Sequence, residues 1–113
     1  MIIPGQVVLF RFPQTDLEQG KLRPALVIAG LPGEFDDWLI CMISTQTRHY
    51  LGGFDELVDE GDNDHLRSGL KAISVIRVGR LAVVNAGQLL GTIGEIDAER
   101  LERIKTNLAN WLK

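Results

Sequence analysis

The apolar residues of this chain are gathered in short runs rich in β-branched side chains, and turn-forming residues close most of these runs. Runs this short are typical of buried strands, whereas a helix needs a longer amphipathic pattern. Pro13 ends the first run, and a loop is expected to follow it as far as Lys21. Residues 72–78 and 81–85 are expected to form a hairpin across Gly79 and Arg80. The other predicted strands are residues 7–10, 25–29, 38–43 and, as a short edge strand, 54–58. Closely spaced strands with tight turns favour a small closed barrel.

Only the end of the chain carries a helical pattern. Asp97 can cap this helix, and Ile96 before it can pack back onto Leu101. The apolar residues then recur at the spacing of one helix face, which consists of Leu101, Ile104, Leu108 and Trp111. With 113 residues and 45% hydrophobic content, residues 1–113 are expected to form a single domain, mainly β with a C-terminal α-helix.

The cysteine and histidine content limits the chemistry that the chain can perform. The single cysteine, Cys41, lies inside an apolar run, so a buried structural thiol is expected and no internal disulfide can form. Two histidines and one cysteine do not supply the usual ligands of a zinc site. Residues 59–64 lack the ligand spacing of an EF-hand, and the glycines of residues 87–94 are expected to form turns. No metal and no cofactor are therefore expected.

The N-terminus lacks the basic start and the long apolar stretch of a signal peptide. No apolar run approaches the roughly 18 residues of a membrane span. We therefore expect a cytoplasmic protein that makes no contact with a membrane.

The net charge of −3 and the pI near 5.3 count against a nucleic-acid binder, but the charge is unevenly placed. Six carboxylates lie within residues 55–64, which leaves +3 for the rest of the chain. We expect this acidic stretch to be a solvated loop, remote from any binding groove. The alternative is a loop that folds over such a groove and restrains binding there until it is displaced.

Several short motifs occur in a fixed order along nearly the whole chain. The first half reads GQVVLFRFP at residues 5–13, TD at 15–16 and KLRPALVI at 21–28. The later segments are ISTQ at 43–46, GLK at 69–71 and SVIR at 74–77. This ordered set resembles the MazF/PemK (Kid) family of toxins from type II toxin–antitoxin systems. The resemblance implies a small SH3-like barrel of the MazF/PemK/CcdB type, a homodimer, a cognate antitoxin partner and metal-independent endoribonuclease activity against single-stranded RNA.

The resemblance also points to catalytic residues. It implies Arg23 and Ser44 as the arginine and the hydroxyl of the site, Glu18 as a neighbouring acid and Arg77 as a second cation. An arginine fork can clamp two phosphate oxygens, and a serine hydroxyl can donate a hydrogen bond to a third. A carboxylate whose pKa is raised by the site could accept the proton of the ribose 2′-hydroxyl. Attack by that hydroxyl would leave a 2′,3′-cyclic phosphate.

Further basic and polar residues are expected to bind the RNA or, in its place, an acidic tail of the antitoxin. They are Arg11, Lys21, Thr45, Gln46, Arg48, Arg67, Lys71 and Arg80.

The chain departs from the family pattern at two positions. Ser44 stands where relatives carry threonine, which keeps the hydroxyl. Gly79 stands where Kid-type relatives often carry an aspartate, so either Glu18 serves instead or the enzyme is weakened. Two alternatives stay open. One is a non-catalytic toxin that binds a protein target such as a topoisomerase, and the other is an SH3-like interaction module whose aromatic groove consists of Phe35, Trp38 and Phe54.

Overall fold

The structure, a computed structural model, describes residues 1–11 and 21–113. Six strands form one antiparallel sheet in the order β4-β5-β3-β2-β1-β6. The elements along the chain are β1 (Gln6–Arg11), β2 (Leu22–Gly30), β3 (Asp37–Ser44), η1 (Thr47–His49), β4 (Glu56–Val58), α1 (His65–Ser68), β5 (Ser74–Asn85), η2 (Ala86–Gln88), β6 (Thr92–Glu95) and α2 (Ala98–Leu112). The predicted strands at 7–10, 25–29, 38–43 and 54–58 are confirmed to within a few residues.

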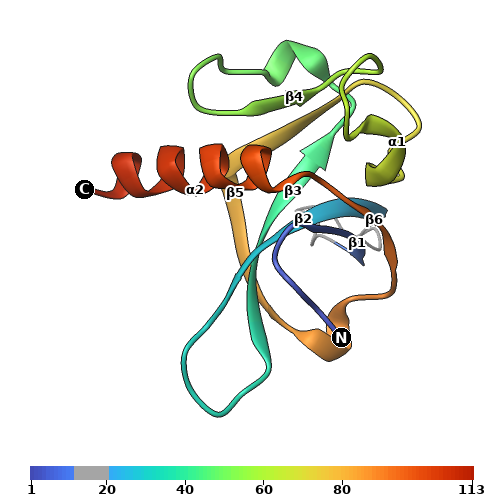
Figure 1. The fold of residues 1–113 in the computed structure, drawn as a ribbon. Coiled ribbons are helices and arrows are strands. Elements are labelled where there is room, and N and C mark those ends of the chain that lie inside the picture. The colour runs from blue at the N-terminus through green and yellow to red at the C-terminus, as the bar shows by residue number, and fades with distance from the viewer. Residues whose placement is uncertain (12–20) are drawn as a thin grey trace.

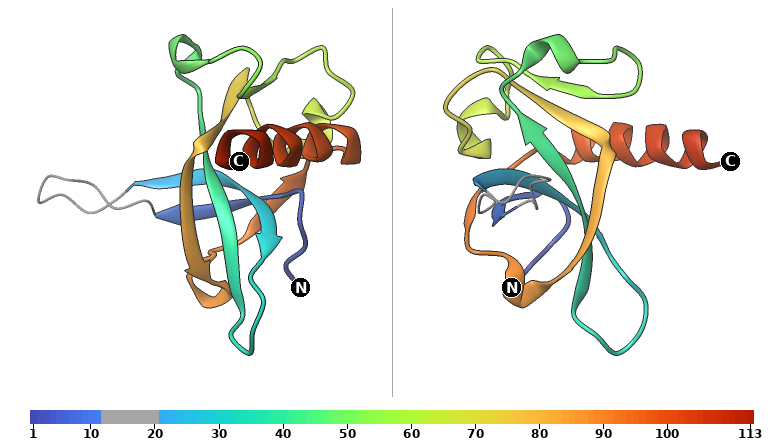
Figure 2. Two further views of the ribbon diagram at one scale, coloured as in Figure 1. Left: turned by 90° about the vertical axis from the view of Figure 1, so that its left-hand side faces the viewer. Right: turned by 180° about the vertical axis from the view of Figure 1, so that it is seen from behind.

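The sheet is strongly curled, so that β1 runs across the direction of β5 (Figure 2). α2 lies against one face of the sheet (Figure 1), where Ile104 and Leu108 join an apolar cluster with Leu26 and Ile76. A second buried cluster, which includes Phe10, covers the opposite face. Burial of each such side chain stabilises the fold by about 1.5–3 kcal/mol. The expected β fold with a terminal helix is confirmed. The sheet is a curled half-barrel, however, and not the expected closed barrel, because among the described residues its edge strands β4 and β6 do not pair with each other.

β5 corrects one prediction, because residues 72–78 and 81–85 do not form a hairpin. They belong to one strand, and both halves pair with β3. Met42 pairs with Arg77 while the adjacent Cys41 pairs with Leu81, so residues 78–80 form a bulge in β5. The buried carboxylate of Asp55 accepts the Val78 N–H at 3.1 Å, which replaces a ladder hydrogen bond there. A glycine inside an apolar run was therefore the sign of a bulge and not of a turn.

β6 was missed by the sequence analysis, which expected turns throughout residues 87–94. Its Gly94 lies against α1, where an added Cβ would collide with the Arg67 carbonyl oxygen. Gly69, with φ of +74°, ends α1, and a Cβ there would collide with the Ile93 carbonyl oxygen. Glycine weakens the sequence signal of a strand, yet here it permits the close approach of α1 and β6.

α2 agrees with the predicted helix. Its cap residue, Asp97, accepts the backbone N–H of Arg100 at 2.8 Å. The apolar face packs as expected, except that Trp111 is 55% exposed; its ring stands edge-on to the Phe54 ring at a centroid distance of 5.6 Å. Among the described residues, no helix is both long enough and apolar enough to cross a membrane.

The acidic stretch is not the solvated loop that its composition predicted. Asp64 is fully buried, and its two carboxylate oxygens accept hydrogen bonds from the Arg100 guanidinium at 2.8 and 3.0 Å. Arg100, itself only 5% exposed, also pairs with Asp62 at 2.9 Å and Glu56 at 3.1 Å. Desolvation opposes ionisation of Asp64, but the bonds from Arg100 and from the Asp97 N–H outweigh it and lower the pKa of this carboxyl. The stretch therefore fastens α2 to β4 and α1.

Candidate functional site

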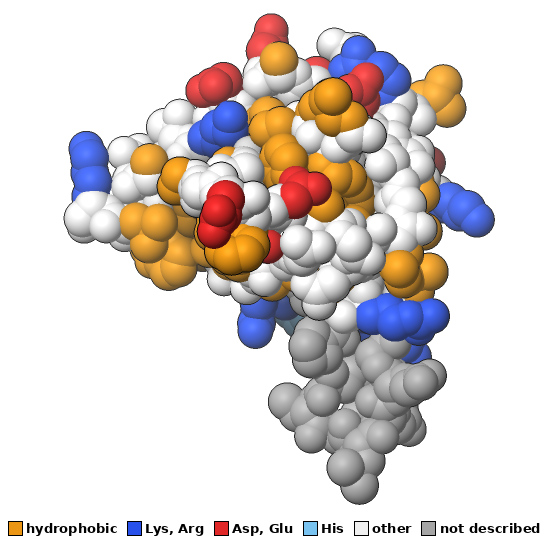
Figure 3. Space-filling view, turned by 90° about the horizontal axis from the view of Figure 1, so that it is seen from below, with side chains coloured by type: hydrophobic (Ala, Val, Ile, Leu, Met, Phe, Trp, Pro, Cys, Tyr) orange, Lys and Arg blue, Asp and Glu red, His pale blue; other side chains and the backbone are white. Residues whose placement is uncertain are grey.

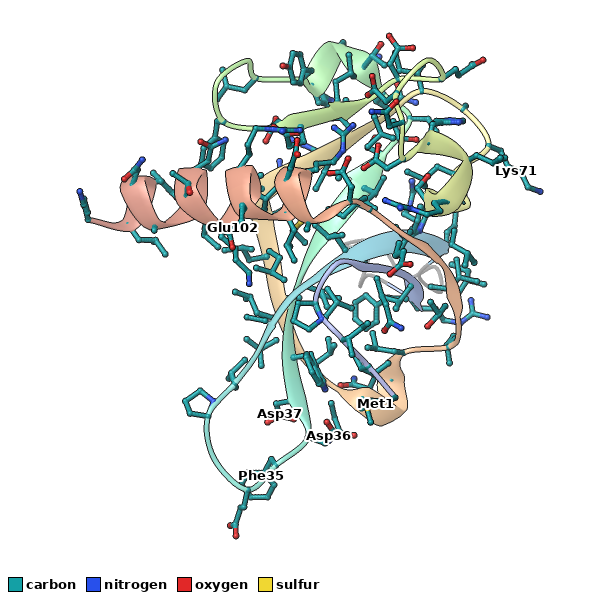
Figure 4. The ribbon with its side chains drawn as sticks, in the orientation of Figure 1. Met1, Phe35, Asp36, Asp37, Lys71 and Glu102 are labelled. Atoms are coloured by element: carbon teal, nitrogen blue, oxygen red, sulfur yellow. The ribbon has the colours of Figure 1, made fainter. Side chains whose placement is uncertain are left out.

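A pocket of about 480 Å³ opens at the ends of β2 and β3, beside the segment that joins α1 to β5. Its apolar lining includes Leu9, Leu22, Ile43, Leu70 and Ile93. Its polar lining includes four residues that the sequence analysis selected, namely Arg23, Ser44, Thr45 and Lys71. Segments far apart in the sequence thus contribute candidate RNA-binding residues to one pocket. Lys71 points outward into solvent (Figure 4).

Strand register places Arg23 and Ser44 opposite each other. Ala25 pairs with Met42 across β2 and β3, and continuing this antiparallel register by two residues aligns Arg23 with Ser44. Residues directly opposite in a ladder point to the same face of the sheet. Pro24 holds the preceding Arg23 in extended backbone, which keeps it in the strand. Strand register thus places Arg23 and Ser44 on one face, and both line the pocket.

Ser44 is 7% exposed, and its hydroxyl oxygen accepts the Gln46 N–H at 3.0 Å. Within residues 1–11 and 21–113, its own O–H donates to no protein group. A serine hydroxyl carries one donor as well as its acceptor lone pairs. The turn after β3 therefore orients the Ser44 oxygen and leaves its proton for an incoming oxygen atom.

Arg77, another expected site residue, does not line the pocket. Arg77 lies on β5 opposite Met42, on the same sheet face as Arg23 but one row further along. Glu18 lies outside the described residues. None of the described lining residues is acidic, so they offer no carboxylate as a proton acceptor.

The remaining expected RNA contacts are spread over several elements. Arg48 lies on η1, which packs against β5, and Arg80 lies on β5 three residues beyond Arg77. Gln46 is exposed next to Thr45, and Arg11 and Lys21 are exposed at the ends of β1 and β2. Arg67 lies instead in α1, beside Gly94 and Glu95.

His49 is a residue that sequence reasoning considered only as a zinc ligand. Partial desolvation, followed by repulsion from Arg77, Arg48 and Arg80, lowers the pKa of its imidazole. The nearness of η1 to the bulged part of β5 brings these groups together, and no local sequence pattern reports that contact. Cys41, by contrast, is fully buried, and burial raises the pKa of its thiol, as expected for a structural cysteine.

The structure does not form the aromatic groove of the interaction-module alternative. Trp38 packs beside one apolar cluster, and Phe54 packs beside the cluster on the opposite face. Phe35 is 70% exposed on the connection between β2 and β3 (Figure 4). Since the three rings do not face a common surface, that prediction was wrong. Within the described ranges, no His, Cys, Asp or Glu side chains form a group that could hold a metal ion.

The chain thus forms a curled six-stranded half-barrel with a C-terminal helix, and Arg23 and Ser44 line a pocket at one end of its sheet. The chain belongs to the PemK-like, MazF-like toxins of type II toxin–antitoxin systems, whose family profile matches residues 3–112.

Solved structures of this class superpose over almost the whole chain. MazF from Deinococcus radiodurans shares 22% sequence identity with a TM-score of 0.69, covering 96% of this chain and 94% of that one. A MazE-MazF structure from the same organism gives 22% identity and a TM-score of 0.71, covering 96% and 93%. An endoribonuclease in complex with its cognate antitoxin, from a mycobacterial species, shares 17% sequence identity with a TM-score of 0.70, covering 99% of this chain and 95% of that one. A search of curated proteins found no match.

Proposed function

We propose that this protein is an endoribonuclease toxin that cleaves single-stranded RNA without a metal ion. The observation that carries the proposal is the alignment of Arg23 with Ser44 beside a pocket at the end of the sheet. A planar guanidinium fork matches two oxygens of a phosphate, and the free Ser44 proton can bond a third. Family membership supports the same activity.

In the proposed reaction the ribose 2′-oxygen attacks the adjacent phosphorus, and the bond from phosphorus to the 5′-oxygen breaks. The 2′-hydroxyl loses its proton to a base, and the departing 5′-oxygen takes up a proton, so the product is a 2′,3′-cyclic phosphate. Arg23 and Ser44 stabilise the charge that develops on the phosphorane oxygens. Glu18, five residues before Arg23, is proposed as the base on the strength of the family resemblance, and Arg77 as a second cation near the RNA.

The experiment is an incubation of purified protein with a long single-stranded RNA in EDTA, followed by end-group analysis. Cleavage that leaves 2′,3′-cyclic phosphate ends is the expected result. Loss of cleavage in EDTA would refute the metal-free route. Absence of cleavage under all conditions would favour the non-catalytic alternative, a toxin that binds a protein target. The glycine at position 79, where Kid-type relatives often carry an aspartate, favours the same alternative.

We further propose that the protein is a cytoplasmic homodimer with a cognate antitoxin. Two of the similar structures contain an antitoxin. Hydrophobic side chains gather over the middle of one face of the molecule (Figure 3). A two-fold partner would cover such a surface.

A further inference from the structure

The bulge at residues 78–80 reverses the alternation of side chains along β5. In a regular strand Arg77 and Leu81 would share a face, because side chains four residues apart point the same way. Here Arg77 pairs with Met42 on the face that carries Arg23. Leu81 instead packs against the apolar cluster beneath α2, on the opposite face. The bulge therefore lets one strand supply a cation to the Arg23 face and an apolar side chain to the core.

The carboxylate of Asp55 joins this bulge to the turn that precedes β4. One of its oxygens accepts the Val78 N–H at 3.1 Å, and the other accepts the Leu51 N–H at 3.0 Å. Asp55 is only 7% exposed, and its own N–H donates to the Leu51 carbonyl oxygen at 2.8 Å. The turn is thus closed in both directions and holds the carboxylate still. Val78 is fully buried, where a backbone N–H without an acceptor is costly.

The residue before Asp55 contacts the same bulge by packing. The Phe54 ring lies beside Gly79, and the Phe54 carbonyl oxygen accepts the side-chain N–H of Asn107 on α2 at 3.0 Å. This packing and the pairing of β5 with β3 do not involve the carboxylate of Asp55. A variant of Asp55 should therefore still fold, with a bulge that is less firmly held.

We propose that Asp55 is a positioning residue for RNA binding, which holds the β5 bulge and so keeps Arg77 on the Arg23 face without itself contacting RNA. The inference rests on the proposed function and deepens it. Both carboxylate oxygens of Asp55 are engaged by backbone N–H groups of the fold. A negative charge by itself opposes the binding of a polyanion. A favourable contribution of Asp55 to RNA binding therefore acts through the geometry of β5.

The test uses a single-stranded DNA oligonucleotide, which has repeating phosphates but no 2′-hydroxyl and so stays intact. Its dissociation constant is measured over a series of salt concentrations. Arg77→Ala should weaken binding and reduce the slope of log Kd against log salt concentration by about 0.7, the effect of losing one phosphate contact on a single strand. Asp55→Asn keeps the shape of the side chain but has one acceptor oxygen for two N–H groups. It should change affinity and slope in the same direction as Arg77→Ala.

A double variant shows whether Asp55 acts through Arg77. Once Arg77 is replaced by alanine, adding Asp55→Asn should weaken binding no further, because the positioned group is already gone. If Asp55→Asn weakens the Arg77→Ala protein as much as it weakens the wild type, the two residues act independently and the proposal is overturned.

Asp62→Asn is the matched control, because it removes the same charge from a carboxylate that also accepts a backbone N–H. The Asp62 carboxylate bonds the Asp59 N–H and Arg100, in the network that holds α2. Asp62→Asn should bind the oligonucleotide as well as the wild type or slightly better, since a negative charge is lost. If Asp55→Asn behaves in the same way, the positioning role is refuted.

Hydrogen exchange of the Val78 amide, followed by NMR, tests the bulge directly. Protection of this amide should fall in Asp55→Asn and fall further in Asp55→Ala, which removes both acceptors. Thermal unfolding verifies that both variants are folded at the temperature of the measurement. Unchanged protection in both variants overturns the proposal, because the bulge would then not depend on the carboxylate.

The cleavage assay in EDTA separates this inference from the proposed function. If Asp55→Asn shows the expected binding defect but the wild type cuts no RNA, the positioning role stands and the nuclease proposal fails. If the wild type cuts RNA while Asp55→Asn binds like Asp62→Asn, the nuclease proposal stands and the positioning role fails. Failure of the wild type to bind the oligonucleotide also overturns the positioning role, and the cleavage assay then decides the function alone.

Discussion

At the scale of single residues, Arg23 carries the proposed chemistry because its position is set by β-sheet register and by the proline that follows it. Arg23→Ala should lower the rate of RNA cleavage by about 10²-fold or more, the usual effect of removing a group that stabilises transition-state charge. Arg23→Lys should also be poorly tolerated, because an ammonium cannot form two parallel hydrogen bonds. The measurement is single-turnover cleavage in EDTA, with thermal unfolding to verify the fold.

Arg103→Ala provides the matched control for Arg23, since Arg103 is an exposed arginine in α2 that does not line the pocket. It should retain most of the cleavage rate. Wild-type cleavage by Arg23→Ala would contradict the assigned mechanism.

Packing explains why glycine, and not the aspartate of Kid-type relatives, stands at position 79. A Cβ at this position would lie 3.3 Å from Cε2 of the Phe54 ring, which in turn meets the Trp111 ring. Any side chain there must displace that ring slightly. The bulge thus favours glycine for a packing reason that is independent of catalysis.

At the scale of elements, the attachment of α2 depends on one buried arginine. Removing Arg100 would leave the charge of Asp64 buried and unpaired, which typically costs about 3–5 kcal/mol. Arg100→Met should therefore lower the free energy of unfolding by that amount in urea titrations.

Arg103→Met is the control for Arg100, because the Arg103 side chain is 52% exposed and its ion pair, among the described residues, is with Glu56. An exposed pair of this kind contributes about 0–1 kcal/mol. Equal losses in the two variants would show that burial of the Arg100 network contributes nothing.

The same network predicts sensitivity to acid. The pKa of Asp64 is lowered in the folded protein, and so is that of Asp62, through the Asp59 N–H and Arg100. A carboxyl whose pKa is depressed in the folded protein stabilises the fold at any pH above its ordinary pKa of 3.8. This stabilisation is lost as the pH falls through the folded-state pKa. The midpoint of urea unfolding should therefore drop on acidification below about pH 4. The double variant Arg100→Met with Asp64→Asn should show a smaller drop, and an equal drop would refute the assignment.

At the scale of the whole molecule, we expect two copies to associate. Several large apolar side chains are more than half exposed, among them Phe35, Leu66, Trp111 and Leu112. Covering such surface favours a symmetric contact between identical chains. Light scattering at micromolar concentration should give twice the 12.5 kDa mass of one chain. A monomeric mass would contradict the dimer.

The local sequence determined the features that depend on neighbours along the chain. Short β-branched runs gave most strands of the half-barrel, and the spacing of Leu101, Ile104 and Leu108 gave α2 with its Asp97 cap. The ordered motifs also selected Arg23 and Ser44, which the tertiary structure brings to one pocket. Periodicity predicts these features because side-chain direction follows from backbone repeat alone.

Only the tertiary structure decided the features that depend on distant partners. The continuity of β5 through its bulge is set by pairing with β3, and β6 is formed by pairing with β1. Asp64 is buried because Arg100, 36 residues beyond it, supplies a guanidinium to its carboxylate. His49 is brought close to Arg77 because η1 packs against β5. Register, buried ion pairs and charge clusters are made between segments far apart in the chain, and no local pattern encodes which segments will meet.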